Sequence, residues 1–396
     1  MKTSSNPVIC SIARTPIGRY LGGLSPLRAV DLGARAIAAA VTRSGISSSE
    51  VDEVILGHVL VGGEGQITAR QAAVKAGLSM TIPALNVNKV CISGLTAVGL
   101  ASNAVRLGDA NFVVAGGMES MSNAPHVLRG FRSGRRMGDG KLVDVMLHDG
   151  LFCAFNRSTM GEMSDEVNTR LGVTRPQQDQ WSAESHRRAT RATQEGHFSR
   201  EIVPVEVPQR RGDPITIDAD EGIRPGISVE KLGGLRRAFT EDGTLTAGNS
   251  SQISDGAAAL VVASRPAAQA IGATILAEIV AYGQSSGPDA TLHERPADAI
   301  RMALKRADLS PSDLDMVEIN EAFAAVALWS AQMLGLSFDK VNVYGGAVAI
   351  GHPIGATGAR LVVTLVNALR EAGGGLGAAA LCGGGGQGDA LVIRVL

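Results

Sequence analysis

The chain has 396 residues, more than one ordinary domain holds, so we expect several domains or one large duplicated fold. Apolar residues make up 45% of it, while 49 glycines and only 3% aromatic residues favour close backbone packing. With 37 basic and 38 acidic residues the formal charge is −1, which argues against a nucleic-acid partner.

The four cysteines, Cys10, Cys91, Cys153 and Cys382, form no C-x-x-C pair, which favours a reducing compartment over a disulfide framework. The N-terminus lacks the charged and apolar segments of a signal peptide. No apolar run approaches the roughly 20 residues that a membrane span needs. We therefore expect a cytoplasmic protein that does not bind membranes.

Strand and helix patterns alternate along the chain, which predicts an α/β fold with helices covering the sheet. In chain order we expect a strand at Val8–Ile12, a helix at Leu27–Arg43, a strand at Val51–Leu56, a helix at Gln66–Ala76, a strand at Phe112–Ala115, a helix at Arg175–Glu195, a strand at Met316–Ile319 and a helix at Ala359–Arg370.

One segment near the N-terminus recurs later in the chain. Ala36 falls on Ala299 (299 − 36 = 263), and the same shift places Ser47 on Ser310 without a gap. Both copies predict a helix, a turn with a serine N-cap and a strand. The repeat predicts two similar halves, 1–270 and 271–396. The first half holds an insertion at about 121–246, a common place for substrate contacts.

Cys91 lies in the motif Asn88-Lys-Val-Cys-Ile-Ser-Gly94, just ahead of a predicted helix with apolar residues at Leu95 and Val98. Unpaired N–H groups and the dipole at a helix N-terminus stabilise a thiolate. We therefore expect a lowered pKa and a nucleophilic sulfur. A buried, inert cysteine fits this motif equally well when it is taken alone.

His352 lies within a glycine-rich segment, Gly345 to Gly358, ahead of the last predicted helix. Shifting Cys91 by the repeat length gives position 354 (91 + 263), so His352 occupies nearly the equivalent place in the second half. A duplicated fold would bring the two helix starts together, and neutral imidazole is the usual base for a cysteine nucleophile. The sequence has no H-E-x-x-H motif, so we expect no metal site.

Two further motifs carry candidate groups. Cys382 opens the run Cys-Gly-Gly-Gly-Gly-Gln-Gly388, whose glycines would expose backbone N–H donors. Its G-x-G-x-x-G spacing also occurs in nucleotide-binding oxidoreductases, but the residues after Gly388 predict a strand instead of the required helix. Asn320, in Asn-Glu-Ala-Phe323, follows a predicted strand and is consistent either with holding a water or with capping a helix.

Together with Thr246-Ala-Gly-Asn-Ser-Ser-Gln-Ile-Ser-Asp-Gly256, these motifs, in this order, resemble the thiolase family over essentially the whole chain. The resemblance is greatest to the bacterial acetyl-CoA acetyltransferases, through Asp149-Gly-Leu151, Met160-Gly161 and Glu221-Gly-Ile-Arg224. It implies the thiolase fold, with two pseudo-symmetric βαβαβαββ halves forming a layered α/β/α/β/α core and an inserted loop domain.

The resemblance also implies roles for single residues. Cys91 would take the acyl group, His352 would remove the proton of Cys91, and Cys382 would exchange a proton with the α-carbon. Asn320 would hold a water in an oxyanion site shared with His352, while the N–H groups of Cys91 and Gly384 would form the second oxyanion hole. Coenzyme A would lie along Leu151, Met160, Arg224, Ser251, Ala322 and Phe323.

The function implied is the reversible condensation of two acetyl-CoA molecules to acetoacetyl-CoA and coenzyme A, by a ping-pong mechanism through acyl-Cys91. Coenzyme A thioesters would be substrates, with no permanently bound cofactor. A 3-ketoacyl-CoA thiolase of fatty-acid β-oxidation is the alternative, because Thr159 replaces a histidine common in the subgroup. Ser250, Gln252 and Ser254 also depart from the usual N-A-S-G-x-N-D-G.

Two other expectations concern relatives and assembly. A β-ketoacyl synthase, a relative in fold, would have a second active-site histidine in place of Cys382, and an NAD-dependent oxidoreductase would need the missing helix after Gly388. The basic run Gly130-Phe-Arg-Ser-Gly-Arg-Arg-Met-Gly138 resembles the segment through which thiolases form tetramers. We therefore expect a homotetramer.

Overall fold

Ten strands form the main sheet of the structure, a computed structural model that describes residues 6–396. The sheet runs β14-β15-β16-β13-β1-β12-β5-β3-β4, with β2 paired to β12. The first half of the chain contributes β1 (Val8–Arg14), β2 (Gly18–Arg19), β3 (Glu53–Gly57), β4 (Ala84–Val87), β5 (Phe112–Ser120) and β12 (Ser254–Ala263). The second half contributes β13 (Ala277–Ser286), β14 (Met316–Ile319), β15 (Gly375–Gly383) and β16 (Gln387–Val395).

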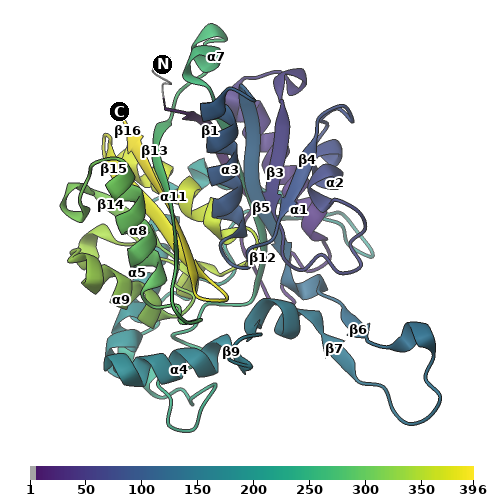
Figure 1. The fold of residues 1–396 in the computed structure, drawn as a ribbon, viewed down its shortest axis with the longest axis vertical. Helices are drawn as coiled ribbons and strands as arrows, with labels where there is room; N and C mark the ends of the chain where they lie inside the picture. The colour runs from purple at the N-terminus through teal and green to yellow at the C-terminus, as the bar shows by residue number, and fades with distance from the viewer. Residues whose placement is uncertain (1–5) are drawn as a thin grey trace.

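Helices cover both outer faces of this sheet and fill the space between its two halves (Figure 1). Helices α1 (Ala29–Ser44) and α2 (Thr68–Lys75) pack on the first half, and α8 (Arg295–Arg306) and α9 (Ala324–Leu334) on the second. Helices α3 (Ser93–Leu107) and α11 (Thr357–Glu371) share one apolar core with strands of both halves. The expected α/β/α/β/α layering is therefore present, although the halves are joined into one sheet by the short pairing of β1 with β13.

The two halves repeat in local detail. Ser47 and Ser310 both precede a short 3-10 helix, and each backbone N–H donates to the acidic residue three positions later, Glu50 or Asp313, at 2.8 Å. The halves differ at the counterpart of β4. In the first half β4 pairs with β3, whereas in the second half Val341 makes only an isolated bridge to Val317 on β14. The pseudo-symmetry thus survives in the turns that cap each helix-to-strand connection.

The stretch that contains helix α3 is more apolar than we expected from the sequence. Val90–Leu107, a stretch of 18 residues, is long and apolar enough to cross a membrane, contrary to the expectation that no run approaches this length. Most of the stretch is buried, and α3 packs between the two halves of the sheet. Packing on both sides therefore accounts for its apolar character.

The segment between β5 and β12 lies largely outside these layers. It contains α4 (Met160–Leu171), α5 (Arg175–Gln194) and α6 (Val229–Gly233), and the hairpins β6 (His126–Leu128) with β7 (Leu142–Asp144), β8 (Phe152–Cys153) with β9 (Ser158–Thr159), and β10 (Val205–Val207) with β11 (Ile215–Ile217). The β6–β7 hairpin projects away from the body of the molecule (Figure 1). Two short helices, α7 (Arg265–Ala270) and α10 (Ala347–Ile350), complete the described chain.

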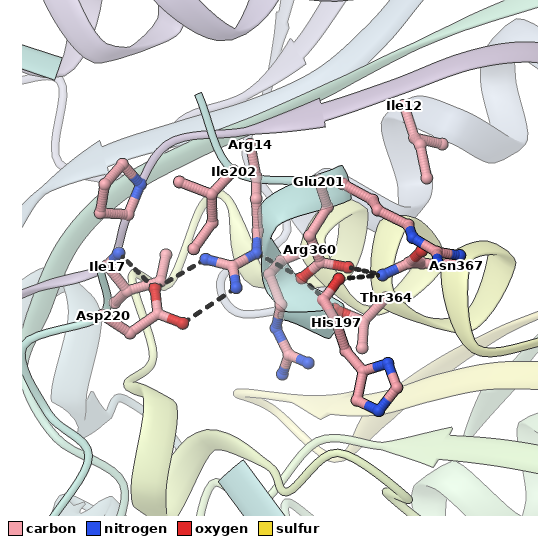
Figure 2. Close-up of polar contacts among 12 residues, drawn as sticks. Ile12, Arg14, Ile17, His197, Glu201, Ile202, Asp220, Arg360, Thr364 and Asn367 are labelled. Atoms are coloured by element: carbon pink, nitrogen blue, oxygen red, sulfur yellow. Dashed lines mark hydrogen bonds and ion pairs between the residues drawn. The ribbon is translucent and has the colours of Figure 1, made fainter. Parts of the chain in front are cut away.

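A buried arginine fastens this segment to the core (Figure 2). Arg14 on β1 is fully buried, and its Nε donates to Glu201 at 2.6 Å while its Nη1 and Nη2 donate to Asp220 at 2.7 and 2.9 Å. Glu201 also accepts from Thr364 and Asn367 on α11. Because a buried charge is tolerated only when it is paired, these contacts fix the segment over the first strand.

Candidate active site

Cys91 sits in a tight turn two residues before α3 begins at Ser93, as the sequence predicted. Val90 has a φ of 51°, which costs a β-branched residue energy, of order 1–3 kcal/mol. Ser93 Oγ stabilises the turn by donating to the Val90 carbonyl at 2.6 Å and accepting from the Lys89 N–H at 2.8 Å. The chain therefore holds Cys91 in a strained but hydrogen-bonded position.

The pKa of Cys91 is raised to about 12 rather than lowered, so that prediction was wrong. Apolar neighbours desolvate the thiol although the residue keeps some solvent contact, and the Glu119 carboxylate raises the pKa further. Desolvation of a thiolate outweighs the stabilisation that the helix start offers. In the resting site the sulfur is consequently a neutral thiol.

Cys382 lies near the end of β15, beside the turn that leads into β16. A Cβ placed on Gly384 in this turn would lie 3.5 Å from Val90, so the glycine turn packs against the Cys91 turn. Burial raises the pKa of the Cys382 thiol, and the neighbouring Cys91 sulfur raises it further. The two cysteines, far apart in sequence, are therefore close enough to interact electrostatically.

His352 is held by its own loop. Its Nδ1 lies 2.7 Å from Thr357 Oγ1, and that hydroxyl donates to the Pro353 carbonyl, so Nδ1 carries the proton and Thr357 accepts it. Burial, and secondly the charge of Arg360, lower the pKa of His352 to about 3. The ring is neutral, and its Nε2 lone pair is free to accept a proton.

Asn320 follows β14 directly and faces this lone pair. Its Nδ2 lies 3.4 Å from His352 Nε2, and the residue is fully buried. Within residues 6–396 its Oδ1 has no hydrogen-bond partner, which is uncommon for a buried amide oxygen. Asn320 and His352 therefore lie side by side in the interior, with polar atoms that face each other.

The starts of α3 and α11 meet through glycines. A Cβ on Gly94 would lie 2.9 Å from the Gly355 carbonyl oxygen, and a Cβ on Gly358 would lie 2.3 Å from the Leu95 nitrogen. No other residue fits such an approach without a shift. This contact brings the Cys91 turn and the His352 loop to the same place between the halves.

Of the residues expected along coenzyme A, most lie in contacts close to the cysteines, whereas Arg224 lies at the surface. The Ser251 N–H donates to the Ala322 carbonyl at 3.1 Å, and Met160 shares an apolar cluster with Ala322, Phe323 and Cys382. Leu151 packs in the cluster that contains Cys91. Arg224, by contrast, is exposed at the surface, and its guanidinium has no partner within the described chain. Its N–H donates to His186 Nδ1 on α5.

Sequence reasoning missed the residues that support His352. The Gln252 side chain donates through Nε2 to the carbonyls of Gly222 and Val348 at 3.0 Å. The Gln252 backbone carbonyl accepts the His352 backbone N–H at 3.1 Å. Ser254 Oγ donates to the Gln252 carbonyl at 2.7 Å and accepts from the His352 N–H at 3.2 Å. The signal was their departure from the family pattern, which the sequence reading assigned only to acyl-chain preference.

Thr159, the other departure, caps a helix. Its hydroxyl accepts from the Glu162 N–H at 3.2 Å, and its backbone N–H donates to the Glu162 carboxylate at 2.7 Å. The reciprocal pair is a capping box that begins α4. A threonine at this place thus secures the helix that carries Met160.

One cavity lies away from these residues. It is a cleft of about 770 Å³ between α5, residues 227–230 and α9, lined by Trp181, Glu184, Arg188 and Glu321 among others. Its described lining includes neither a cysteine nor a histidine, so it offers no nucleophile–base pair. The candidate chemistry is therefore assigned from the convergence of side chains and not from cavity size.

Comparison with known proteins agrees with this arrangement. Residues 7–266 match the family model "Thiolase, N-terminal domain" and residues 273–395 match "Thiolase, C-terminal domain". The chain is 49% identical over 387 residues to the probable acetyl-CoA acetyltransferase of Mycolicibacterium smegmatis, covering 98% of this chain and 100% of that one. It is also 49% identical over 387 residues to the acetyl-CoA acetyltransferase of Cupriavidus necator, covering 98% of each.

A solved structure shares the fold along its whole length. The crystal structure of the Bacillus anthracis acetyl-CoA acetyltransferase superposes with a TM-score of 0.96 at 39% identity and covers 100% of both chains. The fold, the order of the motifs and both halves of the sequence thus agree, and the chain belongs to the thiolase family.

Proposed function

We propose that this chain is an acetyl-CoA C-acetyltransferase, which condenses two acetyl-CoA molecules to acetoacetyl-CoA and coenzyme A and catalyses the reverse cleavage. The observation that carries the proposal is the meeting of the Cys91 turn, the Cys382 turn and the His352–Asn320 pair between the two halves. The names of relatives that are 46–49% identical over nearly the full chain support the same activity.

The first half-reaction transfers an acetyl group to Cys91. The sulfur attacks the carbonyl carbon of acetyl-CoA, and the bond from that carbon to the coenzyme A sulfur breaks. The Cys91 proton passes to His352 Nε2, and the departing thiolate takes the proton of Cys382, which leaves Cys382 ionised. Because the pKa of Cys91 is high and that of His352 is low, the proton moves as the attack proceeds, without a stable ion pair beforehand.

The second half-reaction forms the carbon–carbon bond. Ionised Cys382 takes a proton from the methyl group of a second acetyl-CoA, and Asn320 and the Nε2–H that His352 now carries are placed to stabilise the enolate oxygen. The carbanion attacks the acetyl group on Cys91, the Cys91 thioester breaks, and the Cys91 thiolate takes back the proton held on His352 Nε2, which restores all three groups. Acetoacetyl-CoA then leaves the site.

The raised pKa of Cys382 supports this order. A thiol that is protonated at rest can give its proton to the departing coenzyme A thiolate and then act as the base of the second step.

The test is coenzyme A-dependent cleavage of acetoacetyl-CoA, followed in wild type and in Cys91→Ala, Cys382→Ser and a buried-cysteine control, Cys10→Ala. We expect activity in wild type and in the control only. Cys382→Ser should still acquire an acetyl group on Cys91 from acetyl-CoA, visible by mass spectrometry. Full activity in Cys91→Ala, or none in wild type, would refute the proposal.

A longer-chain 3-ketoacyl-CoA thiolase is the second candidate. The observation in its favour is that Thr159, which replaces a histidine, is engaged with Glu162 and leaves no imidazole at the start of α4. Comparing kcat/KM for acetoacetyl-CoA and 3-ketooctanoyl-CoA separates the two. An equal or higher value for the longer substrate would favour this second candidate.

We further propose a cytoplasmic homotetramer that acts in fatty-acid metabolism on coenzyme A thioesters, without a resident cofactor. The β6–β7 hairpin supports the assembly, because it projects from the body and exposes Phe131, Met137 and Leu142 (Figure 1). Exposed apolar groups of this kind mark contact surfaces. Sedimentation of wild type and of Phe131→Ser/Met137→Ser tests the proposal, since the double variant should form a smaller species.

A further inference from the structure

Asp389 is a fully buried carboxylate on β16 at which several donors converge. Its Oδ1 accepts from Lys89 Nζ at 2.7 Å, and its Oδ2 accepts from Thr96 Oγ1 at 2.6 Å and from the Tyr282 hydroxyl. Gln284 Nε2 donates to the same hydroxyl at 3.0 Å. This polar cluster has no part in the chemistry described above.

The cluster joins the two cysteine turns. Lys89 lies two residues before Cys91, and Thr96 lies on the first turn of α3. Asp389 pairs across the β15–β16 ladder with Leu381, the residue before Cys382. A Cβ on Gly383 would lie 3.2 Å from the Lys89 carbonyl oxygen, so the two turns also touch through their backbones.

We propose that Lys89 and Asp389 are positioning residues, whose ion pair holds the Cys91 turn against the β15–β16 hairpin and sets the placement of the two sulfurs. The pair has a second effect, because opposite charges 2.7 Å apart largely cancel at the neighbouring thiols. Removing either partner would leave one uncompensated charge, on the residue two before Cys91 or on the strand paired with the Cys382 strand. The expected effect on turnover rests on the proposed function, whereas the expected effect on alkylation of Cys91 does not.

The sign of that uncompensated charge distinguishes positioning by this pair from a general loss of structure. Other titratable groups of the described chain that face this region include Glu119 from β5 and Cys382 from β15 beside Cys91, and Tyr282 from β13 beside Asp389. Replacing Lys89 leaves a negative charge, which disfavours the thiolate, whereas replacing Asp389 leaves a positive charge, which favours it. Misfolding alone predicts no such opposition.

The experiment measures the rate at which iodoacetamide alkylates Cys91 as a function of pH, by mass spectrometry of the peptide that contains it. The variants are Lys89→Met, Asp389→Asn, the double variant and Lys89→Arg, with Lys75→Met as an exposed-lysine control. At a fixed pH of about 8 we expect the rate of Lys89→Met to fall about tenfold and that of Asp389→Asn to rise by a similar factor. The double variant and the control should lie near wild type.

Turnover provides the second readout. We expect kcat to fall by about 10- to 100-fold in each single variant, because sub-ångström placement of reacting groups is lost, while KM stays nearly constant. Lys89→Arg should recover most of the rate. Alkylation rates that do not change, or that change in the same direction in both single variants, would overturn the inference. If the alkylation rates of the two single variants change in opposite directions but the protein has no thiolase activity, only the proposed function is refuted.

Discussion

Replacing Thr357 by valine tests the support of His352 directly. Valine keeps the shape of threonine but removes the oxygen that lies 2.7 Å from His352 Nδ1 in a fully buried position. An unpaired buried N–H costs about 1–3 kcal/mol. The ring escapes this cost by moving its proton to Nε2, which converts the base into a donor. The same energy predicts that kcat/KM falls about 5- to 150-fold.

The matched control is Thr357→Ser, which retains the hydroxyl. The assay is the rate of coenzyme A-dependent cleavage of acetoacetyl-CoA over a range of substrate concentrations, with urea unfolding of each variant to compare stability. We expect the serine variant to stay close to wild type. A valine variant within twofold of wild type, or a serine variant as slow as the valine one, would show that Thr357 does not set the protonation of His352.

Two further predictions concern stability. Arg14→Met should lower the free energy of unfolding by about 3–5 kcal/mol, because it leaves two buried carboxylates unpaired, whereas Arg28→Met at a half-exposed pair should cost about 0–1 kcal/mol. Equal losses in urea unfolding would contradict this difference. Burial raises the pKa of Glu119 from 4.5 to about 8, so folding binds a proton between these values and stability declines as pH rises through that range. Glu119→Gln should therefore lose less stability than wild type between about pH 6 and 8; identical pH slopes would exclude Glu119 as the cause.

Sequence patterns placed the reacting groups at the correct ends of their elements. Asn320 follows β14, which the pattern bounded correctly at Met316–Ile319, and Cys91 precedes α3 as expected. Both inferences depend on local periodicity and on residues adjacent in the chain, which a sequence displays directly. The repeat likewise predicted that the starts of α3 and α11 would meet, because it is a relation between two stretches of the same sequence.

Errors arose where distant contacts decide. The strand expected at Phe112–Ala115 runs to Ser120, because Gly116 and Gly117 are close contacts within the strand and do not end it. A Cβ on Gly117 would lie 2.1 Å from the Gly355 carbonyl oxygen, a contact between residues far apart in sequence. The prediction of a lowered pKa for Cys91 was wrong for the same reason, because the apolar cluster against which Cys91 packs includes distant residues such as Leu60 and Ile354.

The glycine contact between α3 and α11 has a consequence for how substrate preference can change. The contact leaves no room for a side chain at Gly94, Gly355 or Gly358. A larger residue there would push the two helix starts apart and increase the distance between Cys91 and His352 without changing either residue. The inserted segment, which supplies Leu151 and Met160, reaches the same region without crossing that contact. We therefore expect changes in acyl-chain preference to arise more readily in the insertion than at the glycine contact, which keeps the gap between nucleophile and base fixed.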